Sequence, residues 1–555
     1  MVKWMTRCLW TCGVLVGVVC ECRAAEPVPL DQIQDAIRDG CERILRTQRE
    51  DGALVIDTGH FGREGVYVYP VGVVSLAVLA LEHALPHLKG QTATRAREAA
   101  LKAIAWIGQQ PLDQKTYSAG LVISALYQDH PSKYQRLIGE YTEMLILSQH
   151  QTGRDTGYWG YDLYLPVRYQ ERQKDKPPPT LARGDHSNTQ FAVLGLLFGK
   201  YSGFQVPKKT WSLLRQHYID FQNQDGGWGY GPDYGRKGSY ANMTLASTIS
   251  LEICEEMLFA GEHRQCIAPP ESRPVEKGLE WVGENLKYDE LETYGLYALE
   301  RLGILSGLSE FGGKAWFDEG AARLVRTRSW QAQGCYGTEV GAAFAVLFLS
   351  RGLEPVIINK LKRTGDWDND PYDIKHLVEY ITTYFQYPKQ WRIVTLKADV
   401  DFLLRVPVLY ISGHEVLHFT DDEKAKLKQY VERGGTIFAM DCCAKGDFDK
   451  SFRSLVAELW PGETLQGLPK THPIYENPRP LATRPEFLGL SLDKGQGRLG
   501  VIYSPHDMCC RWHMGGSRAK AVFDVGTNIF FYVDKIASKA TLPAAPARAP
   551  EGGQN

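Results

Sequence analysis

The feature that most constrains this chain is a loose repeat of two helices joined by a turn rich in glycine, tryptophan and tyrosine. The clearest copy begins at His217 and reads HYIDFQNQDGGWGYGPDYGRKGSYANMTLASTISLEI. Weaker copies begin at Gly40, Leu145 and Ala322. Repeated helical pairs bury their apolar faces by stacking on their neighbours, so we expect one continuous helical assembly.

The second helices of the repeats are apolar on nearly every face. Their segments are YPVGVVSLAVLALEHA, TYSAGLVISALY, SNTQFAVLGLLFGKY, NMTLASTISLEIC, ETYGLYALERLGIL and TEVGAAFAVLFLSRG. Such a helix must be buried on both sides, whereas the first helices carry Arg, Gln and Glu on one side. This contrast predicts an inner and an outer ring of helices.

The glycine and tryptophan turns resemble a known repeat. Gln222, Gly226 and Trp228 are spaced as in the QW-type repeat of squalene cyclases and protein prenyltransferase β-subunits. The segments GDHSNTQFAVLGLL, DGGWGY and YGLYALERLGILSG are also similar to toroids of secreted bacterial proteins of unknown function. The resemblance implies an all-α domain over residues 26–358, an α/α toroid of about six helical hairpins.

The chemistry of those families does not carry over to this chain, because one fold can host unrelated activities. The acidic cluster at Asp366 lies beyond the last inner helix beside Pro371 and is interpreted as a linker. Gln333 stands where the zinc-binding Asp of prenyltransferases would precede Cys335. The Cys-Gly-Glu-Gln sequence of thioester proteins is missing as well.

After the toroid, short runs rich in β-branched residues alternate with amphipathic helices. WRIVTL, VPVLYIS, GTIFAMD and RLGVIYS are typical of strands, and DDEKAKLKQYVERGG and FDKSFRSLVAELW of the helices between them. This alternation predicts a doubly wound α/β domain with three layers over residues 359–537.

The same region resembles the family called domain of unknown function 4159. The resemblance runs from LKRTGDWDNDPYDI through LYISGHE, GGTIFAMD, FDKSFR, THPIY and YSPHDM. It implies a fold similar to the flavodoxin-like glutamine-amidotransferase and ThuA group, and no established activity.

The HEVLH segment, His414 to His418, matches the zinc-binding pattern of metallopeptidases, which requires both histidines on one helix. The strand VPVLYIS ends just before it, and Thr420 with Glu423 forms a capping box that starts a helix near Asp421. We therefore expect a loop, with no bound metal and no cofactor. Because ligands bind at the carboxyl ends of such strands, His414 and Glu415 remain candidates for ligand binding.

Two cysteine doublets follow later strands of the same predicted sheet. The residues at these strand ends are Asp441, Cys442, Cys443, His506, Asp507, Cys509 and Cys510. A disulfide between the two doublets is the leading interpretation in an oxidising compartment. The alternatives are a metal or redox site, a catalytic pair of Cys442 and His506, and free buried thiols, while Asp441 and Asp507 are candidate ligand-binding residues.

Polar and aromatic groups also gather where the inner helices begin or along them. The candidate ligand-binding residues are Asp185, Asn188, Gln190, Trp228, Tyr297 and Glu300. One interpretation makes Asp185 a helix cap and Glu300 a paired core charge. The other is a polar cavity for a glycan or peptide, where Asp185 and Glu300 could act as acid and base.

Residues 1–25 combine a basic segment, an apolar segment and small residues, as a signal peptide does. An uncleaved anchor and a lipid anchor are the alternatives. We expect an extracytoplasmic protein without a transmembrane span after cleavage, and a disordered tail over residues 538–555. The net charge of -2 leaves no basic surplus for nucleic acid.

Because each catalytic signature is incomplete, we expect a non-catalytic binding or scaffold protein of the cell envelope. Its partners would be a small ligand, glycan or peptide, and other envelope proteins. A hydrolase at Cys442 and His506 and a carbohydrate-active toroid are the alternatives.

Overall fold

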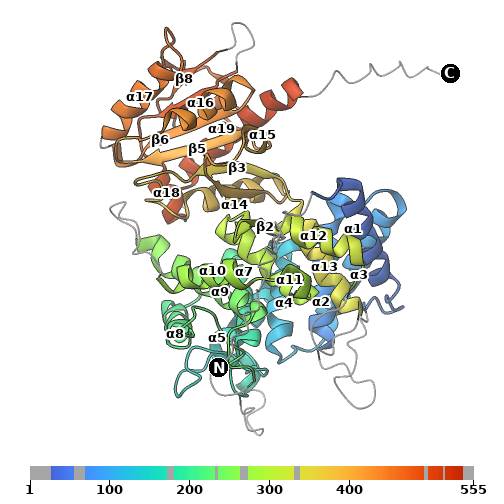
Figure 1. Ribbon diagram of the computed structural model, residues 1–555. Coiled ribbons are helices and arrows are strands. Elements are labelled where there is room, and N and C mark those ends of the chain that lie inside the picture. Colours follow the sequence, from blue (N-terminus) through green and yellow to red (C-terminus); the bar gives the residue numbers. More distant parts are fainter. Residues whose placement is uncertain are drawn as a thin grey trace, which may run out of the picture.

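The computed structural model describes residues 27–54, 69–171, 181–231, 235–262, 273–330, 338–444, 446–492, 498–516 and 519–541. They form an all-helical N-terminal half followed by an α/β C-terminal half (Figure 1), which confirms the predicted fold class. The expected signal peptide and the chain after Thr541 lie outside the described residues.

The apolar second helices form a closed inner ring. They are α2 (Pro70–Ala84), α4 (Thr116–Asp129), α7 (His186–Tyr201), α9 (Ala241–Phe259), α11 (Thr293–Ser306) and α13 (Thr338–Gly352). Each packs on the next, and α13 packs on α2 to close the circle. The inner ring predicted from the apolar segments is therefore present.

The amphipathic first helices lie outside this ring. They are α1 (Leu30–Leu45), α3 (Gly90–Gln109), α5 (Gln135–Ser148), α8 (Lys208–Asp220), α10 (Arg273–Asn285) and α12 (Trp316–Thr327). In α1, for example, Ile33, Ile37, Cys41 and Ile44 are buried at helical spacing and the other face is polar. We call residues 30–352 the toroid.

Short elements complete the toroid. They are η1 (Leu85–His87), η2 (Pro131–Tyr134), α6 (Val167–Gln170), η4 (Ala260–Glu262), η5 (Tyr288–Glu290), β1 (Glu310–Phe311) and β2 (Lys314–Ala315).

A recurring hydrogen-bond pattern links the repeats. The side-chain amide of Gln222 donates to the carbonyl oxygens of Gly226, in its own turn, at 2.8 Å and of Pro274, in the next outer helix, at 2.7 Å. Gln149 donates in the same way to Gly157 and Thr210. The side-chain amides of these glutamines thus link each of the two turns to the following outer helix by hydrogen bonds.

Gly226 has a φ of +90°, and a Cβ there would lie 2.6 Å from a backbone carbonyl oxygen of α10. This position requires glycine. The indole of Trp228 is fully buried and donates to the carbonyl of Tyr218 at 2.9 Å. Trp228 is therefore a core residue of the repeat.

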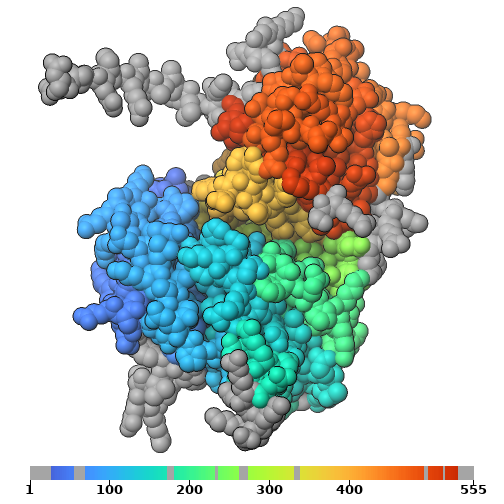
Figure 2. All heavy atoms as spheres, turned by 180° about the vertical axis from the view of Figure 1, so that it is seen from behind, coloured from blue at the N-terminus to red at the C-terminus, as the bar shows by residue number. Residues whose placement is uncertain are grey.

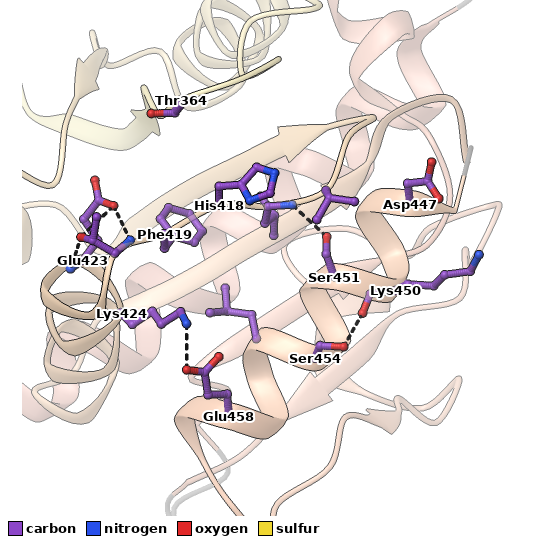
Figure 3. Close-up of a pocket in the computed structure, with 14 residues that line it drawn as sticks. Thr364, His418, Phe419, Glu423, Lys424, Asp447, Lys450, Ser451, Ser454 and Glu458 are labelled. Carbon is purple, nitrogen blue, oxygen red and sulfur yellow. Dashed lines mark hydrogen bonds and ion pairs between the residues drawn. The ribbon is translucent and has the colours of Figure 1, made fainter.

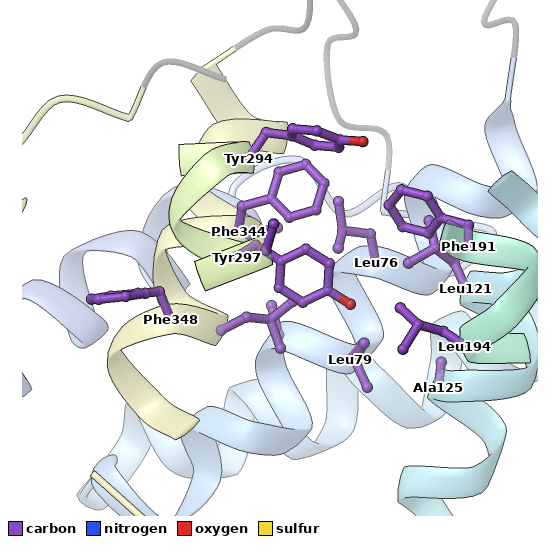
Figure 4. Close-up of a cluster of buried hydrophobic side chains, with 14 of the residues drawn as sticks. Leu76, Leu79, Leu121, Ala125, Phe191, Leu194, Tyr294, Tyr297, Phe344 and Phe348 are labelled. Atoms are coloured by element: carbon purple, nitrogen blue, oxygen red, sulfur yellow. The ribbon is translucent and has the colours of Figure 1, made fainter. Parts of the chain in front are cut away.

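The centre of the inner ring is filled by side chains. Figure 4 shows Tyr297 directed toward Leu79 and Leu194, with Phe344 and Phe191 nearby. The segment Pro70–His87 within this ring has a mean hydropathy of 1.3 and is long enough to cross a membrane, but 78% of it is buried. An inner helix enclosed by its neighbours has the same length and apolar composition as a membrane-spanning helix.

The C-terminal half is built on one sheet. Its strands are β3 (Val356–Leu361), β4 (Gln390–Val394), β5 (Val408–Gly413), β6 (Thr436–Asp441), β7 (Gln466–Gly467), β8 (Leu488–Leu490) and β9 (Val501–Ser504). They lie in the order β4-β3-β5-β6-β9-β8-β7. The first five are parallel, and β7 and β8 add an antiparallel edge.

Helices cover both faces of this sheet. One face packs on α14 (Asp373–Phe385), α18 (Cys509–Met514), α19 (Lys520–Thr541) and η7 (Pro473–Tyr475). The other packs on α15 (Val400–Leu404), α16 (Asp421–Glu432) and α17 (Asp447–Leu459). Along β5, Tyr410 belongs to the first core and Leu409 and Ile411 to the second, as a period of two requires.

The two halves contact each other through α14 and β4 (Figure 2, where this part is yellow). Glu256 of α9 forms ion pairs with Lys375 and, at 3.1 Å, with His376. The backbone N–H of Ile393 donates to the carbonyl of Gly307 at 2.7 Å. A Cβ on Gly307 would lie 2.8 Å from the Trp391 ring, so glycine permits this close approach.

Two predicted boundaries need correction. Strand β3 begins at Val356, so the α/β half starts before residue 359. Helix α19 continues to Thr541, beyond the expected domain end at 537. The predicted domain left out only the first residues of β3, which closely follow the apolar helix α13, and the last residues of α19, which run into the Pro/Ala-rich tail.

Candidate ligand site at the carboxyl edge of the sheet

The strand order creates a switch point. After β3 the chain forms β4 on one side of β3, and it then crosses over to form β5 on the other side of β3. In open α/β sheets of this flavodoxin-like order, ligands bind outside the carboxyl ends of the two strands at the switch point. The loops that follow β3 and β5 therefore define the candidate site.

Asp366 joins these two loops. It lies in the loop after β3 and accepts hydrogen bonds from the backbone N–H groups of His414, at 2.6 Å, and Glu415, at 3.2 Å. The side chains of Asn369, at 3.0 Å, and Arg363, at 3.3 Å, also contact it. Partial burial acts to raise the pKa of Asp366, but these donors outweigh it and hold that pKa below its usual value.

Lys360, at the end of β3, orders the rest of the same loop. Its buried ammonium lies 2.7 Å from Asp368 and 2.7 Å from Asp373, and donates to the carbonyl of Asp370 at 2.9 Å. The interpretation of this acidic cluster as a linker is wrong. It follows a buried parallel strand, and the run VIINKL before it is the signal that could have located it.

The HEVLH segment is a loop, as predicted. Strand β5 ends at Gly413, α16 begins at Asp421, and Thr420 and Glu423 form a complete capping box. The His414 ring lies 3.3 Å from Asp366, and Glu415 is exposed. His414 is thus half-buried in the junction of the two loops, while Glu415 faces solvent beside it.

A groove of about 700 Å³ adjoins this loop. Figure 3 shows it between the loop after β5, the start of α16 and one side of α17. Its lining residues are Thr364, Val416, Leu417, His418, Phe419, Thr420, Glu423, Lys424, Asp447, Lys450, Ser451, Ser454, Leu455 and Glu458. His418 of the HEVLH segment also lines this groove, which we call the edge groove.

The cysteine doublets meet near this edge, but they do not form the predicted disulfide. Cys442, Cys443 and Cys509 are thiols, so no bond joins one doublet to the other. Cys510 is disulfide-bonded. The prediction was wrong because strand order brought the doublets together without fixing which sulfur atoms approach.

The Cys442 thiol is held in an acidic and buried environment. It lies 3.3 Å from a carboxylate oxygen of Asp370. A hydrogen bond with Cys509 acts to lower its pKa, but burial and the charges of Asp370 and Asp507 raise the pKa of Cys442 to about 12. Burial and the charge of Asp373 raise the pKa of Asp370 itself to about 7.

The other residues at these strand ends have separate contacts. The charged partner of His506 is Glu486 at 3.8 Å, and 58% of the His506 side chain is exposed. A carboxylate oxygen of Asp441 accepts from the backbone N–H of Gly446 at 3.2 Å. Asp507 lies 3.1 Å from the Cys509 sulfur. The thiol of Cys442 thus interacts with carboxylates, and His506 lies on the surface with Glu486.

In the toroid, Asp185 is an N-cap. Its buried carboxylate accepts from the backbone N–H of Asn188 at 2.7 Å and from the Asn188 side chain at 2.8 Å. Glu300 lies 3.0 Å from Arg351 of α13, in the core. Burial raises the pKa of Glu300 to about 7 although Arg351 and Arg301 act to lower it.

Gln190 and Tyr297 instead contact a buried arginine. Arg301 donates to the amide oxygen of Gln190 at 2.5 Å, and its guanidinium lies 3.8 Å from the centre of the Tyr297 ring. Tyr297 and Arg301 line a cavity of about 170 Å³ between the toroid and α14. We call this the interdomain cavity.

The raised pKa of Cys442 leads to a test of the hydrolase alternative. At pH 7 the folded protein should react with iodoacetamide at Cys442 more than about 100-fold slower than the unfolded chain, since the thiolate is the reactive form. Peptide mass spectrometry after timed alkylation measures both rates. Rapid alkylation of folded Cys442 that is lost in His506→Ala would instead indicate an activated nucleophile.

Comparison with known proteins identifies the C-terminal half. Residues 357–533 match the family model described as Domain of unknown function (DUF4159). No curated protein matches the chain. The predicted resemblance of the α/β domain to that family is confirmed over the region that carries the candidate site.

Proposed function

We propose that this is an extracytoplasmic binding or scaffold protein of the cell envelope that holds a ligand in the edge groove. The observation that carries the proposal is the groove itself, which lies at the carboxyl edge of a flavodoxin-ordered sheet. Its volume of about 700 Å³ falls within the range of small-ligand sites, about 300 to 1,000 Å³.

The chemistry of the edge groove suits a glycan or a peptide. Val416, Leu417, Phe419 and Leu455 supply apolar surface. Hydroxyl groups and charges of both signs surround these side chains. Sites of this kind combine apolar contact area with a few polar groups that orient the ligand.

Two features support the proposed location. The N-terminal sequence has the basic and apolar segments of a signal peptide. Cys510 is disulfide-bonded, and disulfides persist mainly in oxidising compartments. We also propose that the toroid is of the squalene-cyclase and prenyltransferase type, which the repeated hydrogen bonds of Gln149 and Gln222 support.

The contacts favour binding over catalysis. The raised pKa of Cys442 disfavours a thiolate, and Asp185 and Glu300 are occupied by a helix cap and an arginine. Neither carboxylate lines the edge groove or the interdomain cavity, where a substrate would have to bind.

A substitution that fills the edge groove tests the proposal. Ser454 is exposed on α17 and lines the groove, so Ser454→Trp should block it, whereas Ala457→Trp places the same ring on the same helix outside the lining. Thermal shift with a panel of envelope glycans and peptides is the measurement. A ligand at about 100 times its dissociation constant should stabilise the wild type by about 2.7 kcal/mol.

We expect Ser454→Trp to abolish that stabilisation and Ala457→Trp to retain it. Since His418 lines the groove, His418→Ala should weaken ligand binding while leaving the unliganded stability nearly unchanged. If every stabilising ligand keeps its effect in Ser454→Trp, no ligand binds in the edge groove and the proposal is contradicted.

The interdomain cavity is a second candidate position for a ligand. Among the described residues, Nε and Nη1 of the buried Arg301 make no hydrogen bond, and no carboxylate lies within ion-pair distance. A buried guanidinium in this state favours a small anion beside it. We therefore propose that the cavity holds a small carboxylate or similar anion.

Replacing Arg301 with methionine removes the charge and keeps an unbranched apolar stem in its place. Acetate, compared with chloride at fixed ionic strength, should raise the melting temperature of the wild type and have no such effect on Arg301→Met. The anion would neutralise a charge that the variant lacks. Equal acetate effects in both proteins would contradict this second site.

A further inference from the structure

Two carboxylates and two thiols converge beneath the carboxyl edge of the sheet, apart from the edge groove. They come from three loops, each after a parallel strand: Asp370 after β3, Cys442 after β6, and Asp507 with Cys509 after β9. None of them lines the edge groove. Strand order alone therefore brings together residues that are up to 139 positions apart in the sequence, 370 to 509.

Three of the four ligand atoms are close enough to one another to share one ion, and Asp370 contacts one of these three. The sulfur atoms of Cys442 and Cys509 and a carboxylate oxygen of Asp507 all lie within 4.8 Å of one another. Asp370 contacts the Cys442 sulfur at 3.3 Å, and Asp507 contacts the Cys509 sulfur at 3.1 Å. Ligands bound to one zinc ion at about 2.0 to 2.3 Å are separated by comparable distances.

The burial of these side chains favours a bound cation, and their ligand atoms indicate which cation fits. Cys442 is 1% exposed, Cys509 0% and Asp370 3%, whereas Asp507 is half-buried and lies toward solvent. Thiols and carboxylates gathered in a buried space are stabilised by a cation that all of them contact. Two sulfur and two oxygen ligands favour a borderline-soft divalent ion with tetrahedral geometry over magnesium or calcium, which require oxygen ligands.

Other possible ligands lie next to these four residues, so the proposed set has to be chosen among them. His414, Cys443 and Cys510 lie in overlapping groups, and Cys442 is shared by all but one of the groups that could hold a metal. The sulfur of Cys510 is already in a disulfide and cannot supply a thiolate. The set of Cys442, Cys509, Asp507 and Asp370 has both buried thiols and two carboxylates.

We propose that Cys442, Cys509, Asp507 and Asp370 bind one divalent zinc-class ion. On binding, each thiol S–H bond is replaced by a bond from sulfur to the metal and its proton leaves to solvent, while each carboxylate donates an oxygen lone pair. No electron is transferred. Because protein ligands fill all four coordination positions, the ion is structural. It links the segments that follow β3, β6 and β9.

Cobalt(II) is the probe for this site. The full chain is purified under argon without reductant, so that the Cys510 disulfide is kept, then treated with chelator and titrated with cobalt. We expect one equivalent to produce a thiolate-to-cobalt absorption band and the visible bands of tetrahedral cobalt. Zinc should displace the cobalt, and magnesium and calcium should not.

Substitutions separate this site from other thiols. Cys442→Ser and Cys509→Ser should each weaken cobalt binding by more than about 100-fold, since even changes behind the ligands cost about 10- to 100-fold. Cys254→Ser, which removes a buried thiol of α9, should leave the bands unchanged. If the cysteine variants fail to fold, Asp507→Asn, with its half-buried side chain, should still weaken cobalt binding and shift the visible bands.

Several results would overturn the proposal. They are the absence of a thiolate-to-cobalt band in the wild type, an unchanged band in Cys442→Ser or Asp507→Asn, and a disulfide between Cys442 and Cys509 in the protein as purified. The last result would mean that the two thiols form a covalent clip instead of a metal site.

Discussion

The buried contact between Glu256 and the first turn of α14 is the interaction on which the rest of the structure depends. Glu256 belongs to the inner ring, and its ion pairs with Lys375 and His376 are almost completely removed from water. Breaking a buried pair by removing one partner costs about 3 to 5 kcal/mol, because the other charge is left unpaired. The α/β half is therefore held on the toroid by charges that are stable only in the joined state.

Helix α14 has two roles that explain the layout of the candidate sites. One side packs on the sheet through Ile374, Leu377 and Val378. Lys375 and Glu379 close the end of the toroid and line the interdomain cavity. Because this helix directly follows the loop after β3, fixing it on the toroid also fixes the switch point of the sheet. The toroid thus holds the α/β half in position through α14, and the edge groove remains exposed on the α/β half.

Much of the fold could be predicted from the sequence, because it depends on local patterns. Helices apolar on every face indicated an inner ring, and Thr420 with Glu423 located the start of α16. The loop after β3 was missed because its aspartates looked like a linker. Only the hydrogen bonds of Asp366 and the ion pairs of Lys360 show that it is part of the site.

Side-chain contacts between segments that are distant in the sequence could not be predicted. The sequence placed both cysteine doublets at one sheet edge, but it could not show that Cys442 meets Asp370 and Cys509. Nor could it show that Glu300 is paired with Arg351 or that Trp228 is buried. These contacts depend on distances of a few ångströms between side chains, which the spacing of apolar residues along the sequence does not determine.

The most direct test of this account is differential scanning calorimetry, since the central claim is that toroid and α/β half form one unit through α14. The wild type should unfold in a single cooperative transition. Glu256→Gln should separate it into two, while Glu255→Gln, whose partner Arg215 lies within the toroid, should keep one. Two independent transitions in the wild type, or no change in Glu256→Gln, would contradict the account.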